Sequence, residues 1–86
     1  MQLDEISRAP LVQEPTPLHL VGRLSAALDG VQVWCKRDDL TRLGLGGNKL
    51  RKLEFLLWDA LNQGADTVIT TGAAQSNHAR LTAAAA

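Results

Sequence analysis

A lysine that follows three glycines and an asparagine is the first candidate for chemistry in this chain. Lys49 stands in the stretch LGLGGNKLRKLE, residues 43–54, where a helix is predicted to begin. The positive end of a helix dipole disfavours a cation, so a partly desolvated lysine there favours its neutral amine, which can attack a carbonyl. The structural alternative is a solvated basic face of Lys49, Arg51 and Lys52 that follows an asparagine cap.

Two familiar glycine motifs do not fit this loop. A Walker A loop needs Gly-Lys followed by Ser or Thr, whereas Asn48 separates Gly47 from Lys49 and Leu50 follows. A dinucleotide-binding fingerprint would carry a third glycine where Lys49 stands. The sequence therefore supports neither a P-loop nor a Rossmann turn, and the chemistry of the loop depends on Lys49 itself.

The stretch GAAQSNH, residues 72–78, is the second candidate. Its hydroxyl and amide side chains precede a predicted helix, whose N-terminal N–H groups favour an anion. This pattern is typical of an anion or cofactor site. The alternative interpretation is a Ser or Asn helix cap beside an ordinary surface histidine, His78.

The composition indicates a small globular protein. The 86 residues are 45% hydrophobic, and nine basic residues balance nine acidic ones. Zero net charge argues against nucleic-acid binding, and no apolar run approaches the length of a membrane span. No secretory signal is recognised, and Cys35, the single cysteine, cannot form an internal disulfide. We expect a cytoplasmic protein, and we assign no metal ligands.

Hydrophobic periodicity predicts alternating helices and strands. A short helix over 23–28 closes at Asp29-Gly30, and a strand over 31–36 follows it. Residues 50–63 have helical spacing and end before Gly64, a candidate C-terminal cap. The apolar stripe of this helix comprises Leu50, Leu53, Leu57, Ala60 and Leu61. A β-branched run over 66–72 predicts a buried strand, and a helix over 78–86 follows a Ser76 or Asn77 cap.

This order is typical of a parallel α/β fold, in which ligands bind beyond the carboxyl ends of the strands. Both candidate loops lie at such ends. Two parallel strands make a poor sheet alone, and the final ARLTAAAA carries no helix stop signal. We therefore expect residues 1–86 to be a single partial domain, the N-terminal part of a longer chain.

Three further features receive packing interpretations. Residues 36–39, KRDD, are most simply a solvated strand end. The aromatic residues are expected to pack in the core or on the surface rather than to form a stacking platform; they are Trp34, Phe55 and Trp58. Cys35 is expected to pack as a small apolar residue on its strand.

Together, the two loops resemble a known family. The segments KRDDLTRLGLGGNKLRKLEFLLWDAL and GADTVITTGAAQSNHARLTAAAA closely resemble the D-cysteine desulfhydrase and 1-aminocyclopropane-1-carboxylate deaminase family of pyridoxal-phosphate enzymes. The similarity extends upstream to PTPLHLVGRLSAAL and so spans nearly the whole chain. It implies a tryptophan-synthase-β-like fold, fold type II, in which this chain is incomplete.

The resemblance also implies roles for individual residues. Lys49 matches the lysine that binds pyridoxal phosphate covalently and moves the proton of the substrate's α-carbon. Asn77 matches the asparagine that hydrogen-bonds the ring hydroxyl of the cofactor, and it adjoins the substrate. Ser76 matches the serine that meets the substrate carboxylate and assists proton transfer. Gln75 and His78 are expected to bind substrate in the same loop, and Asn48 and Lys52 receive supporting positions.

The implied reaction is α,β-elimination and deamination of a small amino acid. D-Cysteine would give pyruvate, ammonia and sulfide. Alternative activities are L-cysteate sulfo-lyase, with sulfite as leaving group, and 1-aminocyclopropane-1-carboxylate deaminase. Family members commonly form dimers, so a homodimer is expected at full length.

The family also implies that part of the site lies beyond Ala86. The cofactor's phosphate loop and the group facing its pyridine nitrogen have no match within these residues. The 86 residues alone are therefore expected to be inactive. The competing class is a non-enzymatic one, either a truncated remnant or a small module that only binds a partner.

Overall fold

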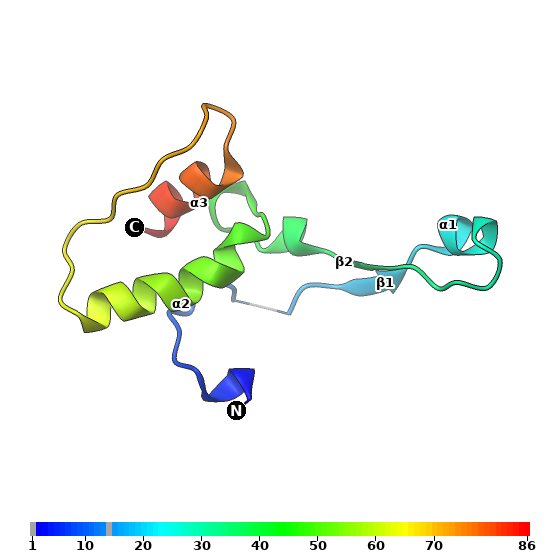
Figure 1. Ribbon diagram of the computed structural model, residues 1–86, viewed down its shortest axis with the longest axis horizontal. Helices are drawn as coiled ribbons and strands as arrows, with labels where there is room; N and C mark the ends of the chain where they lie inside the picture. The colour runs from blue at the N-terminus through cyan, green and yellow to red at the C-terminus, as the bar shows by residue number, and fades with distance from the viewer. Residues whose placement is uncertain (1, 14) are drawn as a thin grey trace.

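The chain forms a helical body from which an arm projects (Figure 1). The computed structural model describes residues 2–13 and 15–86. The arm comprises β1 (Leu18–Leu20), α1 (Gly22–Ala27) and β2 (Trp34–Lys36). The body comprises η3 (Leu43–Leu45), α2 (Lys49–Asn62) and α3 (Asn77–Ala85), and two short 3-10 helices complete the structure, η1 (Leu3–Glu5) and η2 (Asp38–Leu40). The radius of gyration, 16.1 Å, exceeds the roughly 12 Å of a compact domain of this length, because the arm extends away from the body.

The arm is an antiparallel pair of strands with a helix at its tip. His19 pairs with Cys35, and α1 connects the two strands. The predicted helix over 23–28 is confirmed, and Asp29 and Gly30 turn the chain with φ values of 48° and 88°. The strand predicted over 31–36 is confirmed over Trp34–Lys36, where Cys35 is half-buried.

The predicted strand over 66–72 is wrong for this structure. These residues follow an exposed extended path that arches from the end of α2 to the start of α3, and the side chain of Ile69 is 89% exposed. A strand forms only where a neighbour accepts its backbone hydrogen bonds, and among the described residues none lies alongside. The predicted parallel pairing of strands is likewise not seen among the described residues, where β1 pairs with β2 in antiparallel orientation.

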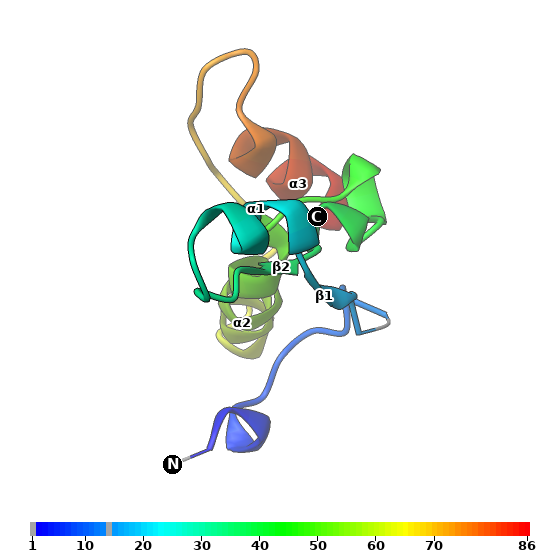
Figure 2. The ribbon, with the colours of Figure 1, turned by 90° about the vertical axis from the view of Figure 1, so that its right-hand side faces the viewer.

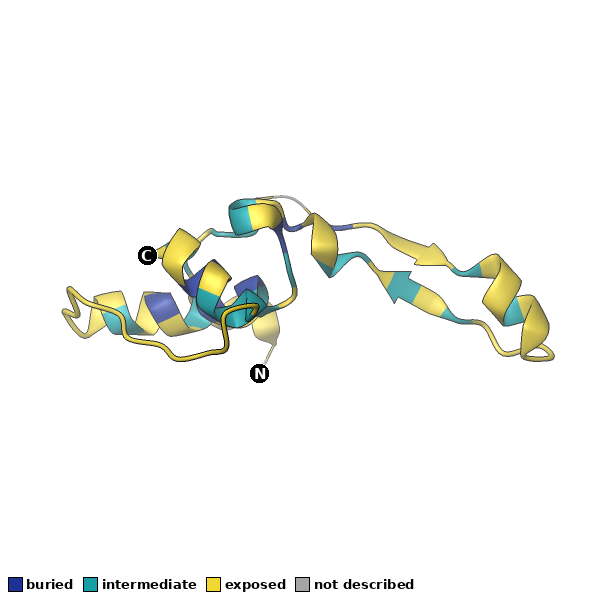
Figure 3. Cartoon of the chain, turned by 90° about the horizontal axis from the view of Figure 1, so that it is seen from above, coloured by how far each residue is buried: buried dark blue, intermediate teal, exposed yellow. Residues whose placement is uncertain are grey.

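The core lies between α2 and α3. Leu50 and Leu81 are fully buried, and Leu53 and Leu57 complete the cluster. Figure 3 shows most of the buried positions on these two helices, with the arm largely exposed. The apolar stripe predicted on α2 is therefore confirmed in its first half, whereas Leu61 is 68% exposed. The helix α3 is shorter than α2, so it covers only part of that stripe.

A buried carboxylate attaches the N-terminal segment to the body. Glu54 of α2 is 5% exposed, and its Oε2 accepts hydrogen bonds from the backbone N–H groups of Leu11 and Val12, both at 3.1 Å. Figure 2 shows η1 lying apart from α2 and α3. No helix in the described part of the chain has the length and apolar character that crossing a bilayer requires.

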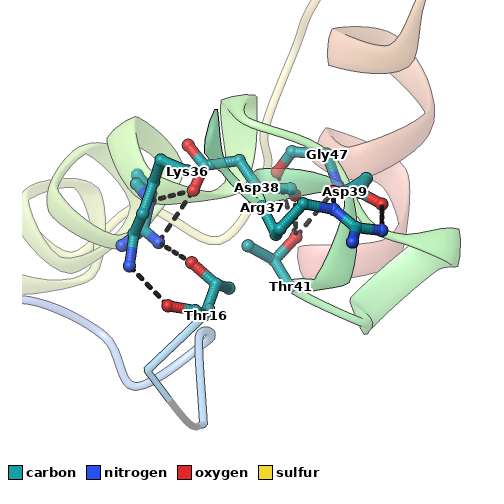
Figure 4. Close-up of polar contacts among 8 residues, drawn as sticks. Thr16, Lys36, Arg37, Asp38, Asp39, Thr41 and Gly47 are labelled. Carbon is teal, nitrogen blue, oxygen red and sulfur yellow. Dashed lines mark hydrogen bonds and ion pairs between the residues drawn. The ribbon is translucent and has the colours of Figure 1, made fainter. Parts of the chain in front are cut away.

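A polar junction fixes the base of the arm to α2 (Figure 4). Arg51 donates to Asp38 Oδ1 at 2.9 Å and to the hydroxyl of buried Thr16 at 2.9 Å. The Lys36 ammonium donates to the Thr16 carbonyl at 2.7 Å. The interpretation of residues 36–39 as a solvated strand end is therefore wrong for Asp38, because Arg51 of α2 lies close enough to pair with it. Lys36 is exposed, as that interpretation expects, although its ammonium is hydrogen-bonded.

The rest of that segment does face solvent. The Arg37 guanidinium donates to both oxygens of Asp39, at 2.9 and 2.8 Å. These hydrogen bonds lower the pKa of the Asp39 carboxyl and raise the pKa of Arg37. The Asp39 side chain is 60% exposed, so salt screens this pair and it contributes little to stability.

Candidate active site

Lys49 is the first residue of α2 and is half-buried. Within the described residues, no hydrogen bond or ion pair engages its ammonium group. This placement confirms the predicted position at a helix start. The predicted basic face is not uniform, because Arg51 is paired with Asp38 at the arm junction while Lys52 is exposed.

The glycine loop before Lys49 has a backbone that other residues would disturb. Gly46 has φ +79°, and a Cβ there would overlap the carbonyl oxygen of Asp39. Gly47 has φ +148°, and a Cβ there would lie 3.0 Å from Leu81 Cδ1 and 3.3 Å from Asn77 Nδ2. Gly47 therefore allows the loop to lie directly against α3, whereas Gly46 allows it to pass close to the Asp39 carbonyl.

The second loop ends in a helix cap. The Ser76 Oγ accepts a hydrogen bond from the Ala79 N–H at 3.2 Å, so Ser76 is the N-cap of α3. Ser76 is half-buried, and a Cβ on Gly72 would lie 2.8 Å from its Oγ. The predicted cap is confirmed, and the hydroxyl lies at the positive end of the α3 dipole.

The structure brings the two loops together through side chains. Asn77 Nδ2 donates to Asn48 Oδ1 at 3.2 Å, and Arg80 Nη2 donates to the Gly46 carbonyl at 2.7 Å. Asn48, expected as a helix cap, makes no capping hydrogen bond. Its side-chain oxygen instead accepts the hydrogen bond from the Asn77 amide. Asn48 is the residue immediately before Lys49, so this bond links Asn77 to the start of α2. Arg80 was missed from the sequence, although it lies one turn after the motif.

The other two predicted residues are placed differently. Gln75 is exposed. His78 lines a cavity of about 310 Å³ between α2 and residues 67–70, and neither Lys49 nor Asn77 lines it. Its Nδ1 is buried without a hydrogen-bond partner among the described residues. The structure thus brings Asn77, which follows Ser76, to Asn48, which precedes Lys49. His78 instead lies at the separate cavity between α2 and residues 67–70.

Gly46→Ala is expected to displace the glycine loop. The methyl group meets the Asp39 carbonyl at a positive φ, so we expect a loss of about 2 kcal/mol or more in the free energy of unfolding. Gly30→Ala is the matched control, since Gly30 has φ +88° but open space around it. Comparing the melting temperatures of the two variants separates the effect of the contact with Asp39 from the effect of the positive φ. Equal melting temperatures would show that Gly46 is not tightly packed.

Known proteins are similar to this chain in sequence and in fold. The family model described as pyridoxal-phosphate dependent enzyme matches residues 10–86. D-cysteine desulfhydrases of Salmonella paratyphi B and Salmonella newport are 56% identical over all of this chain. The chain spans 27% of the length of these relatives. A solved structure described as a crystal structure analysis of the ACC deaminase homologue superposes with a TM-score of 0.85 at 52% identity, over 96% of this chain and 25% of that one.

Proposed function

Because this chain belongs to the family of pyridoxal-phosphate dependent enzymes, we propose that the full-length protein is a lyase that acts on a small amino acid. In this proposal residues 1–86 form the N-terminal part of the enzyme and contribute Lys49, Ser76 and Asn77 to its site. The observation that carries the proposal is the hydrogen bond between Asn77 and Asn48, which joins the second loop to the residue beside Lys49.

The side chains at this junction fit the cofactor's functional groups. Pyridoxal phosphate presents an aldehyde and a ring hydroxyl. Lys49 supplies an amine that no other described residue engages, and this amine would hold the cofactor at its aldehyde carbon. The Asn77 amide has two N–H groups, and its bond to Asn48 uses one of them. The second N–H group and the carbonyl oxygen remain for the ring hydroxyl.

The protein's own groups then handle the proton and the substrate carboxylate. When bound, the cofactor supplies an electron sink for negative charge at the substrate's α-carbon. Lys49 Nζ removes the α-proton. The N-terminus of α3, with the Ser76 hydroxyl, binds the substrate carboxylate, because its backbone N–H groups favour an anion. The thiol leaves the β-carbon as sulfide, and one water molecule hydrolyses the released aminoacrylate to pyruvate and ammonia.

We propose D-cysteine as the substrate, since the curated relatives are named D-cysteine desulfhydrase. The second candidate activity is 1-aminocyclopropane-1-carboxylate deamination, favoured by the name of the similar solved structure. L-Cysteate remains the third substrate to compare. A cytoplasmic homodimer completes the proposal.

A parallel assay of the full-length protein tests these activities. D-Cysteine, L-cysteate and 1-aminocyclopropane-1-carboxylate are supplied separately, and the keto-acid products, sulfide and sulfite are measured. We expect pyruvate and sulfide in equal amounts from D-cysteine and the lowest turnover with the cyclopropane substrate. A protein that binds no pyridoxal phosphate and turns over none of the three would favour the non-enzymatic class.

A further inference from the structure

A single buried hydroxyl closes the glycine loop. Thr41 is 4% exposed, and its Oγ1 accepts a hydrogen bond from the Gly47 N–H at 2.9 Å. The same oxygen lies 3.0 Å from the Gly47 carbonyl and 3.1 Å from the Asp38 carbonyl. The hydroxyl has one hydrogen, which it can donate to either of these two carbonyl oxygens in turn. Figure 4 shows this side chain reaching across to Gly47. Both backbone polar groups of Gly47 thus depend on Thr41.

The loop that Thr41 closes is strained. Arg42 has φ 74° and ψ −56°, and the Leu43 N–H donates to the Thr41 carbonyl at 3.0 Å, which makes a γ-turn of the rare positive-φ kind. Leu45 also has a positive φ of 72°, although its side chain is 86% exposed. Such conformations persist only where surrounding contacts hold them in place.

The closed loop leads directly to Lys49. Gly47 is two residues before Lys49, and α3 is attached to the neighbouring Gly46 carbonyl by Arg80. We propose that Thr41 is a positioning residue, whose hydroxyl holds the strained loop closed and thereby fixes the start of α2, where Asn48 binds Asn77 and Lys49 follows. This role rests on the proposed function of Lys49. It adds a residue that touches neither cofactor nor substrate.

Thr41→Val tests this role because valine keeps the shape and removes the hydroxyl. With the Gly47 groups unpaired, the loop opens and the fraction of molecules with Lys49 in position falls. We expect the apparent dissociation constant for pyridoxal phosphate, followed by the visible absorbance of the bound cofactor, to rise about tenfold. Thr41→Ser keeps the hydroxyl and is expected to stay within about threefold of wild type.

Trypsin gives a second readout without cofactor. Arg42 lies in the loop, and we expect Thr41→Val to accelerate cleavage after Arg42 about tenfold in the cofactor-free full-length protein, whereas Thr41→Ser leaves the rate unchanged. A double variant, Thr41→Val with Leu45→Asn, should recover part of the cofactor affinity, because asparagine adopts positive φ more readily than leucine. If valine prevents folding, the smaller Thr41→Ala is measured in the same assays.

Thr82→Val separates positioning from general stability. Thr82 is also 4% exposed, but its hydroxyl donates only to the His78 carbonyl of its own helix. Equal losses of cofactor affinity in Thr41→Val and Thr82→Val, or no change in either assay for Thr41→Val, would overturn the assignment. Failure of the proposed function would give a different result. A Lys49→Ala variant would then keep the cofactor absorbance, while the trypsin rates of the Thr41 variants would still show whether Thr41 holds the loop closed.

Discussion

Lys49→Ala is expected to abolish both the visible absorbance of bound pyridoxal phosphate and the elimination activity. In the proposed function, the substitution removes both the amine that would hold the cofactor and the base that would move the α-proton. Loss of a general base alone slows a reaction by ~10²–10⁴-fold, so we expect at least ~10³-fold lower turnover. Absorbance spectra after addition of cofactor and pyruvate assays with saturating substrate measure the two effects.

The same substitution should not destabilise the cofactor-free protein. Lys49 makes no described hydrogen bond or ion pair, and a cation at the start of α2 opposes the helix dipole. The melting temperature without cofactor should therefore match or exceed that of wild type. Lys49→Arg, which keeps the positive charge and most of the side-chain length, serves as the control and should be equally inactive. Unchanged colour or activity in either variant would remove Lys49 from its proposed role.

Ser76 should prove important to turnover rather than to cofactor binding. Removing its hydroxyl is expected to lower the turnover number by roughly 10²-fold, in the range of a proton-transfer group, while the cofactor absorbance remains. Because Ser76 is also the N-cap of α3, substitution by alanine alone would confuse the two effects. Alanine at an N-cap costs about 1 kcal/mol, whereas glycine costs only a few tenths.

Comparison of Ser76→Gly with Ser76→Ala separates these contributions. If the hydroxyl acts in proton transfer, both variants lose turnover equally, although glycine melts at the higher temperature. If Ser76 only caps the helix, Ser76→Gly keeps nearly full activity. Steady-state kinetics and thermal melts of the two proteins therefore give opposite answers for the two roles.

Local sequence signals predicted most of the helices correctly. The apolar spacing of Leu50, Leu53 and Leu57 predicts a helix with one face in the core. The helix and its buried face are both confirmed. The Ser76 cap is likewise confirmed by its bond to the Ala79 N–H. The resemblance carried by GGNK and QSN is confirmed by the family match over residues 10–86. Helix periodicity and caps depend on residues within one or two turns, so they can be recognised along the chain.

Interactions between distant segments were not predictable in this way. The strand expected over 66–72 has the right residues but no neighbouring strand among those described, and pairing requires one. Glu54 resembles any helix-surface carboxylate in sequence, yet it is buried beneath the N-terminal segment. Neither result depends on local propensity, because each is decided by which segment lies alongside.

For the site, the sequence by itself determined the residue types and their places on the elements: an amine at the start of α2 and a hydroxyl and an amide at the start of α3. Only the tertiary structure decided that Asn48 turns to Asn77 instead of capping its own helix, and that Thr41 closes the loop. The physical reason is that a side-chain amide or hydroxyl can form hydrogen bonds of similar energy with several alternative partners. Packing of α2 against α3 selects which of them lies within reach.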